Sequence, residues 1–237
     1  MTINHHLNEH DSEFGAGSRE PAQLLSDVRA RVAADFVRET GREIDDDLGG
    51  PSASVAIAQA GDGCIELANI GDCRILYQDE QGTVRSFGTS NVTAFDKKVV
   101  DKAIELGLGT GMPYKDMWPF LREIVRENRE WMNRDAGYWV FDLSDRWKGH
   151  IQTQRMRSRV NRQSFILIMS DGFYRLTDTF KAHTDETLLA KAVNGGIDSL
   201  FAQLREAEAN DSECKRFPRI KSSDDASALL LCVSSEL

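Results

Sequence analysis

The chain has 237 residues, of which 41% are hydrophobic and 28% are charged, enough for one domain with a sizeable core. Its net charge of −9 argues against nucleic acid or an anionic membrane as a partner. Four scattered cysteines without a C-x-x-C pair, no signal peptide and no apolar run of membrane-spanning length predict a cytoplasmic protein with reduced thiols.

The N-terminal third begins with a polar stretch and then changes from helical to strand periodicity. Residues 1–17 lack periodicity, which predicts a disordered tail, and the domain is expected over 18–237. Apolar residues recur near every 3.6 positions from Ser18 to Gly41, which predicts an amphipathic helix. Short runs separated by turn residues follow. They predict an antiparallel meander of four strands at about 54–58, 64–70, 73–77 and 83–87.

Residues 95–150 interrupt this pattern with helical material. One helix is expected to end near 107–111, a second covers Trp118–Arg129, and Tyr138–Asp142 has the pattern of a strand. We therefore expect an insertion over one end of the sheet. Four arginines follow it, and they fit either a solvated basic stretch or a rim that attracts phosphate. They are Arg155, Arg157, Arg159 and Arg162.

The C-terminal part contains a near-continuous apolar run, Ser164–Ser170, typical of a strand buried on both faces. Asp171-Gly172 is expected to turn the chain directly after it. Helices at Glu186–Val193 and Ile197–Glu208 and a final strand at Ala226–Val233 complete the predicted order. The whole pattern indicates an α+β domain.

Three carboxylate-bearing turns lie directly beside predicted core strands. Asp72 is in a Gly-Asp-Cys-Arg turn, Asp171 is in a Ser-Asp-Gly turn, and the pair Asp224-Asp225 precedes the last strand. Each alone is typical of an ordinary turn. Together, carboxylates that converge without His or Cys favour Mg²⁺ or Mn²⁺ over Zn²⁺.

These segments resemble the PP2C (PPM) family of metal-dependent serine/threonine protein phosphatases. The segments that carry the resemblance are Leu67–Arg74, Phe165–Phe173 and Ser223–Leu231, with a small-residue strand at Pro51–Ala58. Gly137–Val140 and Arg216–Arg219 are similar to a bacterial branch of the family.

The resemblance implies an αββα sandwich of two antiparallel β-sheets flanked by helices, with residues 95–150 as a flap that tunes substrate choice. It implies two Mg²⁺ or Mn²⁺ ions bridged by a hydroxide that attacks phosphoserine or phosphothreonine in a protein substrate. Asp171 and Asp224 match metal ligands of the family, and Asp72 matches an Asp associated with a weaker third metal.

The chain also departs from the family pattern. The early Asp-Gly element and the N-terminal strands are missing, which predicts an N-terminally incomplete domain, through either a late start codon or a real truncation. Arg175 stands where many members have a second acidic ligand. The alternative to a hydrolase is therefore a catalytically impaired, phosphatase-like binding module. If the fold held no β-sandwich, an unrelated α/β domain would explain the turns instead.

Overall fold

The computed structural model describes residues 19–44, 50–61, 64–110, 112, 114–157 and 163–234. The described strands are β1 (Ser52–Ala53), β2 (Val55–Gly61), β3 (Cys64–Ile70), β4 (Arg74–Gln78), β5 (Val84–Phe87), β6 (Phe141–Asp142), β7 (Gln152–Arg157), β8 (Gln163–Met169) and β9 (Ala228–Ser234). The described helices are α2 (Pro21–Thr40), α3 (Val92–Glu105), α4 (Tyr114–Arg129), α5 (Asp171–Asp178), α6 (Asp185–Gly195) and α7 (Ile197–Asn210), with a 3₁₀ helix at Arg146–His150.

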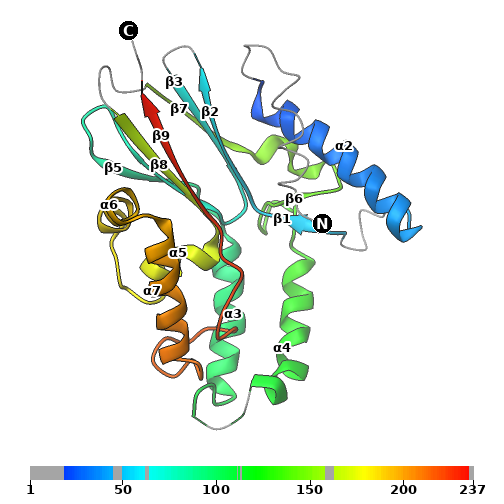
Figure 1. Cartoon of the computed structure of the whole chain (residues 1–237). Coiled ribbons are helices and arrows are strands. Elements are labelled where there is room, and N and C mark those ends of the chain that lie inside the picture. Colours follow the sequence, from blue (N-terminus) through cyan, green and yellow to red (C-terminus); the bar gives the residue numbers. More distant parts are fainter. Residues whose placement is uncertain are drawn as a thin grey trace.

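Two antiparallel sheets face each other in the described part of the chain (Figure 1). One has the order β2-β3-β7 and the other the order β5-β4-β8-β9. Because side chains alternate along a strand, each sheet sends one set inward. The inward set that fills the space between the sheets consists of Ile65, Leu67, Ile75, Tyr77, Met156 and Ile166.

The opposite faces are covered by helices. Leu76, Leu167 and Met169 point away from the first core and pack against α5, α6 and α7. Helix α2 lies on the other side of the molecule, where its buried residues contact Val55 and Ile70 and a short segment around Trp147 (Figure 1). The predicted α+β sandwich of two antiparallel sheets flanked by helices is therefore confirmed.

The predicted four-stranded meander is wrong in one respect, because β3 and β4 do not pair with each other. The hairpin β2-β3 belongs to one sheet and the hairpin β4-β5 to the other. Gly71 lies between them with a φ of 93°, a left-handed conformation that Gly adopts without strain. This bend carries the chain from one sheet across to the second.

The predicted turn after the buried strand is also different. Asp171 and Gly172 begin helix α5, in which Phe173 and Leu176 are buried against the four-stranded sheet. The spacing of these two apolar residues is helical, and a carboxylate in the first turn complements the positive end of the helix dipole.

Of the predicted strand Tyr138–Asp142, only Phe141–Asp142 is a strand, because Tyr138 instead forms an isolated bridge with Met132.

The remaining helices and the last strand agree with the sequence to within a few residues. Helices α3 and α4 form an antiparallel pair with its own small core, built from Val99, Ala103, Met117 and Leu121. The pair extends from one end of the sandwich (Figure 1).

None of the described helices has the length and apolarity needed to cross a membrane. The predicted tail at residues 1–17, Ser18, Arg159 and Arg162 lie outside the described residues.

Candidate functional site: an acidic cluster at one end of the sandwich

The hydrogen-bond register of the four-stranded sheet brings the three predicted carboxylates to the same end of the molecule. Arg74 pairs with Met169, and Met169 pairs with Ala228 on its other side. Asp72 comes two residues before this row and Asp171 two residues after it. Asp224 comes four residues before it, in the segment that leads into β9. The sheet therefore gathers three residues that are far apart in the sequence.

Gly172 allows the N-terminus of α5 to contact the segment before β9. A Cβ atom on this residue would lie 2.1 Å from the carbonyl oxygen of Asp225 and 3.4 Å from the Cβ of Asp224. Nearby, the backbone N–H of Ser170 donates to the carbonyl of Ser227 at 3.0 Å. Only glycine fits at this contact, and the contact holds Asp171 close to Asp224.

Gly71 plays the equivalent part for Asp72. A Cβ atom there would lie 2.1 Å from the Oγ of Ser54 and 2.7 Å from its Cα. The Ser54 hydroxyl donates to Oδ1 of Asp72 and accepts from the backbone N–H of Asp72 at 3.1 Å. The Gly-Asp element thus packs directly on the chain that enters β2, and Ser54 fixes the orientation of the Asp72 carboxylate.

A fourth carboxylate, Asp96 of α3, joins the cluster. Partial desolvation of its carboxylate, together with the negative charges of Asp72, Asp171 and Asp224, raises the pKa of Asp96 to about 6, although the residue as a whole is exposed. The sequence did not single out Asp96, because it stands on a helix next to two lysines and has no motif around it. Its role appears only when the fold places the first turns of α3 beside the strand ends.

The crowding of negative charge is most evident at Asp171. Partial desolvation and the charges of Asp72 and Asp224 raise the pKa of Asp171 to about 6, although the residue as a whole is exposed. A hydrogen bond from the Gly172 backbone and the charge of Arg175 lower this pKa but do not cancel the rise. Burial and the charges of Asp72 and Asp171 also raise the pKa of the Cys73 thiol to about 12. Among the described residues, Asp171 forms no ion pair.

Asp224 differs from the other carboxylates because it is already paired with cations. Its Oδ2 accepts from Nη2 of Arg175 at 2.7 Å, and its Oδ1 accepts from Nζ of Lys221 at 2.8 Å. Behind this pair, the buried carboxylate of Glu208 on α7 lies 3.8 Å from Nη1 of Arg175. Glu208 was not predicted, since on sequence alone it is an ordinary helix residue.

The donor chemistry of the cluster fits a hard divalent cation. Asp171, Asp72 and Asp96 offer carboxylate oxygens whose mutual repulsion a cation would relieve. Within the described ranges, however, no group of three or more Asp, Glu, His or Cys side chains is close enough to enclose a metal ion. Mg²⁺ commonly binds through one or two carboxylates and keeps several waters, and the cluster fits that mode of binding.

The predicted arginine rim does not border this site. Cys64 pairs with Arg157 and Asn69 with Gln152, so Arg155 and Arg157 lie toward the opposite end of β3 from Asp72. Over a seven-residue strand that separation is about 20 Å. Of the two interpretations of these arginines, the solvated basic stretch agrees with the fold for the two that are described.

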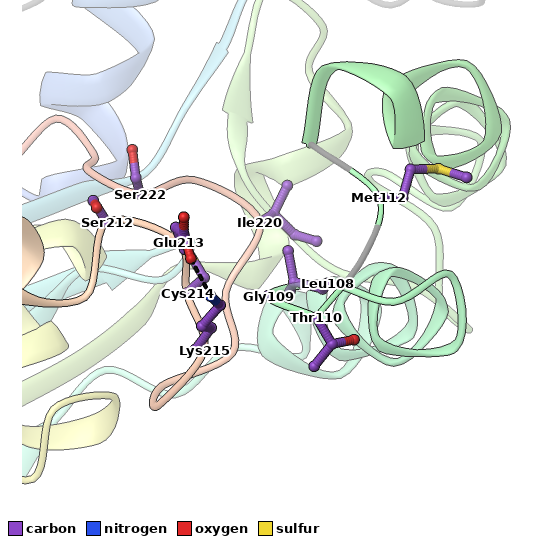
Figure 2. Close-up of a pocket in the computed structure, with 10 residues that line it drawn as sticks. All are labelled: Leu108, Gly109, Thr110, Met112, Ser212, Glu213, Cys214, Lys215, Ile220 and Ser222. Atoms are coloured by element: carbon purple, nitrogen blue, oxygen red, sulfur yellow. Dashed lines mark ion pairs between the residues drawn. The ribbon is translucent and has the colours of Figure 1, made fainter.

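Two cavities are lined by described residues. One, of about 450 Å³, is formed between the end of α3 and the segment 212–222, with Leu108, Met112 and Ile220 as its apolar residues (Figure 2). Ser222, on its edge, is two residues before Asp224. The second, of about 250 Å³, is lined by Gly71, Tyr138 and the ring of His150, which stacks on Trp139 with ring centroids 3.3 Å apart.

Comparisons with known proteins agree with this architecture. A family profile described as protein phosphatase 2C matches residues 2–211. No curated protein matches the chain.

Among solved structures, the Mycobacterium tuberculosis serine/threonine phosphatase PstP/Ppp has 17% sequence identity and a TM-score of 0.52, covering 99% of this chain and 80% of that one. A bacterial serine phosphatase has 16% identity and a TM-score of 0.51, covering 99% and 79%. The PstP catalytic domain solved in complex with two manganese ions has 18% identity and a TM-score of 0.49, covering 98% and 79%.

Proposed function

Since the chain belongs to the protein phosphatase 2C family, a family of serine/threonine phosphatases, we propose that it removes phosphoryl groups from phosphoserine or phosphothreonine in proteins with the help of a divalent cation at the acidic cluster. One observation supports this most strongly. Carboxylates from separate elements meet at one end of the sandwich, and partial desolvation and neighbouring negative charge raise the pKa of Asp171 among them to about 6. A bound cation would remove that repulsion.

The resemblance predicts Asp171 and Asp224 as metal ligands and Asp72 as a weaker third-metal candidate. Of these, Asp171 and Asp72 form no ion pair with described residues, and we propose that they hold the cation. Mg²⁺ or Mn²⁺ is the cation expected from an all-oxygen donor set. When bound, such a cation lowers the pKa of coordinated water and neutralises negative charge that develops on the phosphoryl oxygens. The chain's own contribution is to fix the carboxylates, through Ser54 for Asp72 and through the Gly172 contact for Asp171.

We further propose that the phosphoprotein segment beside the phosphorylated residue lies along the edge formed by α3 and the 212–222 segment. The larger cavity opens there and has apolar residues on one side and Ser212, Lys215 and Ser222 on the other (Figure 2). In this proposal residues 95–150 act as the flap that tunes substrate choice. A cytoplasmic location remains a prediction.

The test is hydrolysis of a phosphoserine peptide by the full chain with and without Mn²⁺. We expect activity that depends on Mn²⁺ and that is lost in Asp171→Asn. Asp101→Asn is the matched control, because Asp101 is an exposed carboxylate on α3 that pairs with Lys97. If wild type and Asp171→Asn hydrolysed the peptide equally well, the proposed role of Asp171 would be wrong.

The second candidate function is a phosphatase-like binding module without catalysis. The ion pair between Asp224 and Arg175 favours it, because a ligand predicted for metal is paired with a side-chain cation instead. Phosphopeptide binding with neither Mn²⁺ uptake nor hydrolysis would support this candidate over the enzyme.

A further inference from the structure

Both carboxylate oxygens of Asp224 already have partners in the protein. Oδ2 accepts a hydrogen bond from Nη2 of Arg175 at 2.7 Å. Oδ1 accepts from Nζ of Lys221 at 2.8 Å and from the backbone N–H of Asp225 at 3.0 Å. A metal ion that coordinated Asp224 directly would have to displace at least one of these donors.

The Arg175 contact is the one that is hard to displace. The Arg175 side chain is 13% exposed and that of Asp224 is 16% exposed, whereas the Lys221 side chain is 61% exposed. A buried, charge-assisted pair loses far more than an exposed one when a partner is withdrawn, because the remaining charge stays in a poorly solvated place. Lys221 can leave into water at little cost, but Arg175 cannot.

The backbone of Asp224 is also fixed by helix α7. Nη1 of Arg205 donates to the carbonyl of Asp224 at 2.9 Å, and the Asp224 N–H donates to Oε1 of Glu208 at 3.3 Å. Arg205 and Glu208 are themselves paired at 2.5 Å. Asp224 is thus held in a network of alternating charges from α5 and α7, with Arg175 at its centre.

Asp171 is in the opposite situation. It starts the same helix that carries Arg175, yet it forms no ion pair with any described residue. The charges of Asp72 and Asp224 raise the pKa of Asp171, and the charge of Arg175 opposes them only in part. Asp72 is oriented by the neutral hydroxyl of Ser54. Among the described residues, the part of the cluster without an ion pair is therefore the Asp171–Asp72 side.

We infer that the guanidinium of Arg175 is a built-in counter-ion for Asp224, so that the acidic cluster takes up one divalent cation, at Asp171 and Asp72, and not two. This inference rests on the proposed function, because it concerns the metal of the same site. It specifies how many ions the site holds and which carboxylates face them, and it makes Arg175 a positioning residue.

The test is calorimetric titration of the full-length chain with Mn²⁺, read as the number of ions bound per chain. We expect one ion for wild type. In Arg175→Met, which removes the charge of the side chain, we expect two, because Asp224 then keeps only the exposed Lys221 as its ion-pair partner. Lys221→Met removes the exposed cation from the same carboxylate and is the matched control, for which we expect one ion.

The possible outcomes separate this inference from the proposed function. Two ions bound to wild type would overturn the inference and leave the phosphatase proposal standing. No ion bound to wild type would overturn both. If Arg175→Met is folded by circular dichroism and still takes one ion with unchanged affinity, the inference also fails. Should Arg175→Met not fold, Arg175→Gln, which also removes the charge, replaces it, and the wild-type count alone still decides between one ion and two.

Discussion

Replacing Gly172 by Ala tests whether the contact between α5 and the segment before β9 holds the site together. The added Cβ would lie 2.1 Å from the carbonyl oxygen of Asp225, whereas real Cβ atoms essentially never come closer than 3.0 Å. One of the two backbone segments must therefore move by roughly 1 Å, and overpacking of this kind costs about 1–3 kcal/mol. Because the obstacle is a backbone oxygen and not a flexible side chain, the upper part of that range applies.

Helix propensity acts in the opposite direction. Gly172 lies in the first turn of α5, and Ala is favoured over Gly in a helix by up to about 1 kcal/mol. If no close contact existed, the substitution would stabilise the protein. With the contact, we expect a net loss of about 2 kcal/mol, measured as a lower midpoint in urea denaturation, together with weaker Mn²⁺ binding.

Gly195→Ala is the matched control, because Gly195 is also helical and an added Cβ would meet only side-chain atoms, the nearest being Oγ of Ser199 at 3.3 Å. We expect its stability to stay within about 0.5 kcal/mol of wild type. A midpoint for Gly172→Ala equal to or above that of wild type would refute the reasoning.

Two further predictions concern charged groups. The pKa of Asp171 is raised from 3.8 to about 6 in the folded protein, so its ionisation weakens the fold as pH rises through that interval. Without metal, the stability of Asp171→Asn relative to wild type should therefore increase between pH 4 and pH 7. The urea denaturation midpoints of both proteins, measured in the presence of a chelator, test this. A constant difference between the two midpoints across that range would contradict the assigned pKa shift. Asp211 and Arg219 form a buried ion pair at 2.6 Å, with both side chains less than a tenth exposed. Asp211→Ala should cost about 3–5 kcal/mol in thermal or urea unfolding because it leaves a buried guanidinium unpaired, whereas Asp101→Ala, at an exposed pair with Lys97, should cost less than about 1 kcal/mol. Similar losses for the two variants would show that burial does not set the difference.

The parts of the fold that depend on local patterns could be predicted from the sequence. The apolar run before Asp171 predicted a buried strand, and β8 has buried residues on both of its faces. Ile166 packs between the two sheets, and Leu167 packs against the helices. The helices α2, α6 and α7 also followed from apolar spacing. The separation of the four early strands into two sheets did not, because antiparallel hairpins have the same pattern whether or not their neighbours pair. It depends on the bend at Gly71 and its contact with Ser54.

The candidate site divides in the same way. Asp72, Asp171 and Asp224 could be predicted because each stands in a turn-forming motif next to a strand. Asp96 and Glu208 could not be predicted, since each is one of several acidic residues on an amphipathic helix, where charged side chains usually face solvent. Their positions follow from how α3 and α7 pack on the sandwich, which is decided by contacts between elements distant in the sequence. Charge networks of this kind have no local signature.

Arg175 shows how one correction of secondary structure changes the chemistry of the site. In a turn after the strand, the direction of its side chain would be undefined. In helix α5, residues four apart lie on one face, one turn above each other, so Arg175 and Asp171 are neighbours. From that place Arg175 reaches Asp224 across the Gly172 contact and leaves Asp171 itself without an ion pair among the described residues. An acidic residue at the same position would instead add a negative charge one turn from Asp171, and both Asp224 and the new carboxylate would then require a cation from solution. The arginine therefore sets the charge that the site must take up from outside, and the helix that the sequence did not predict is what allows it to do so.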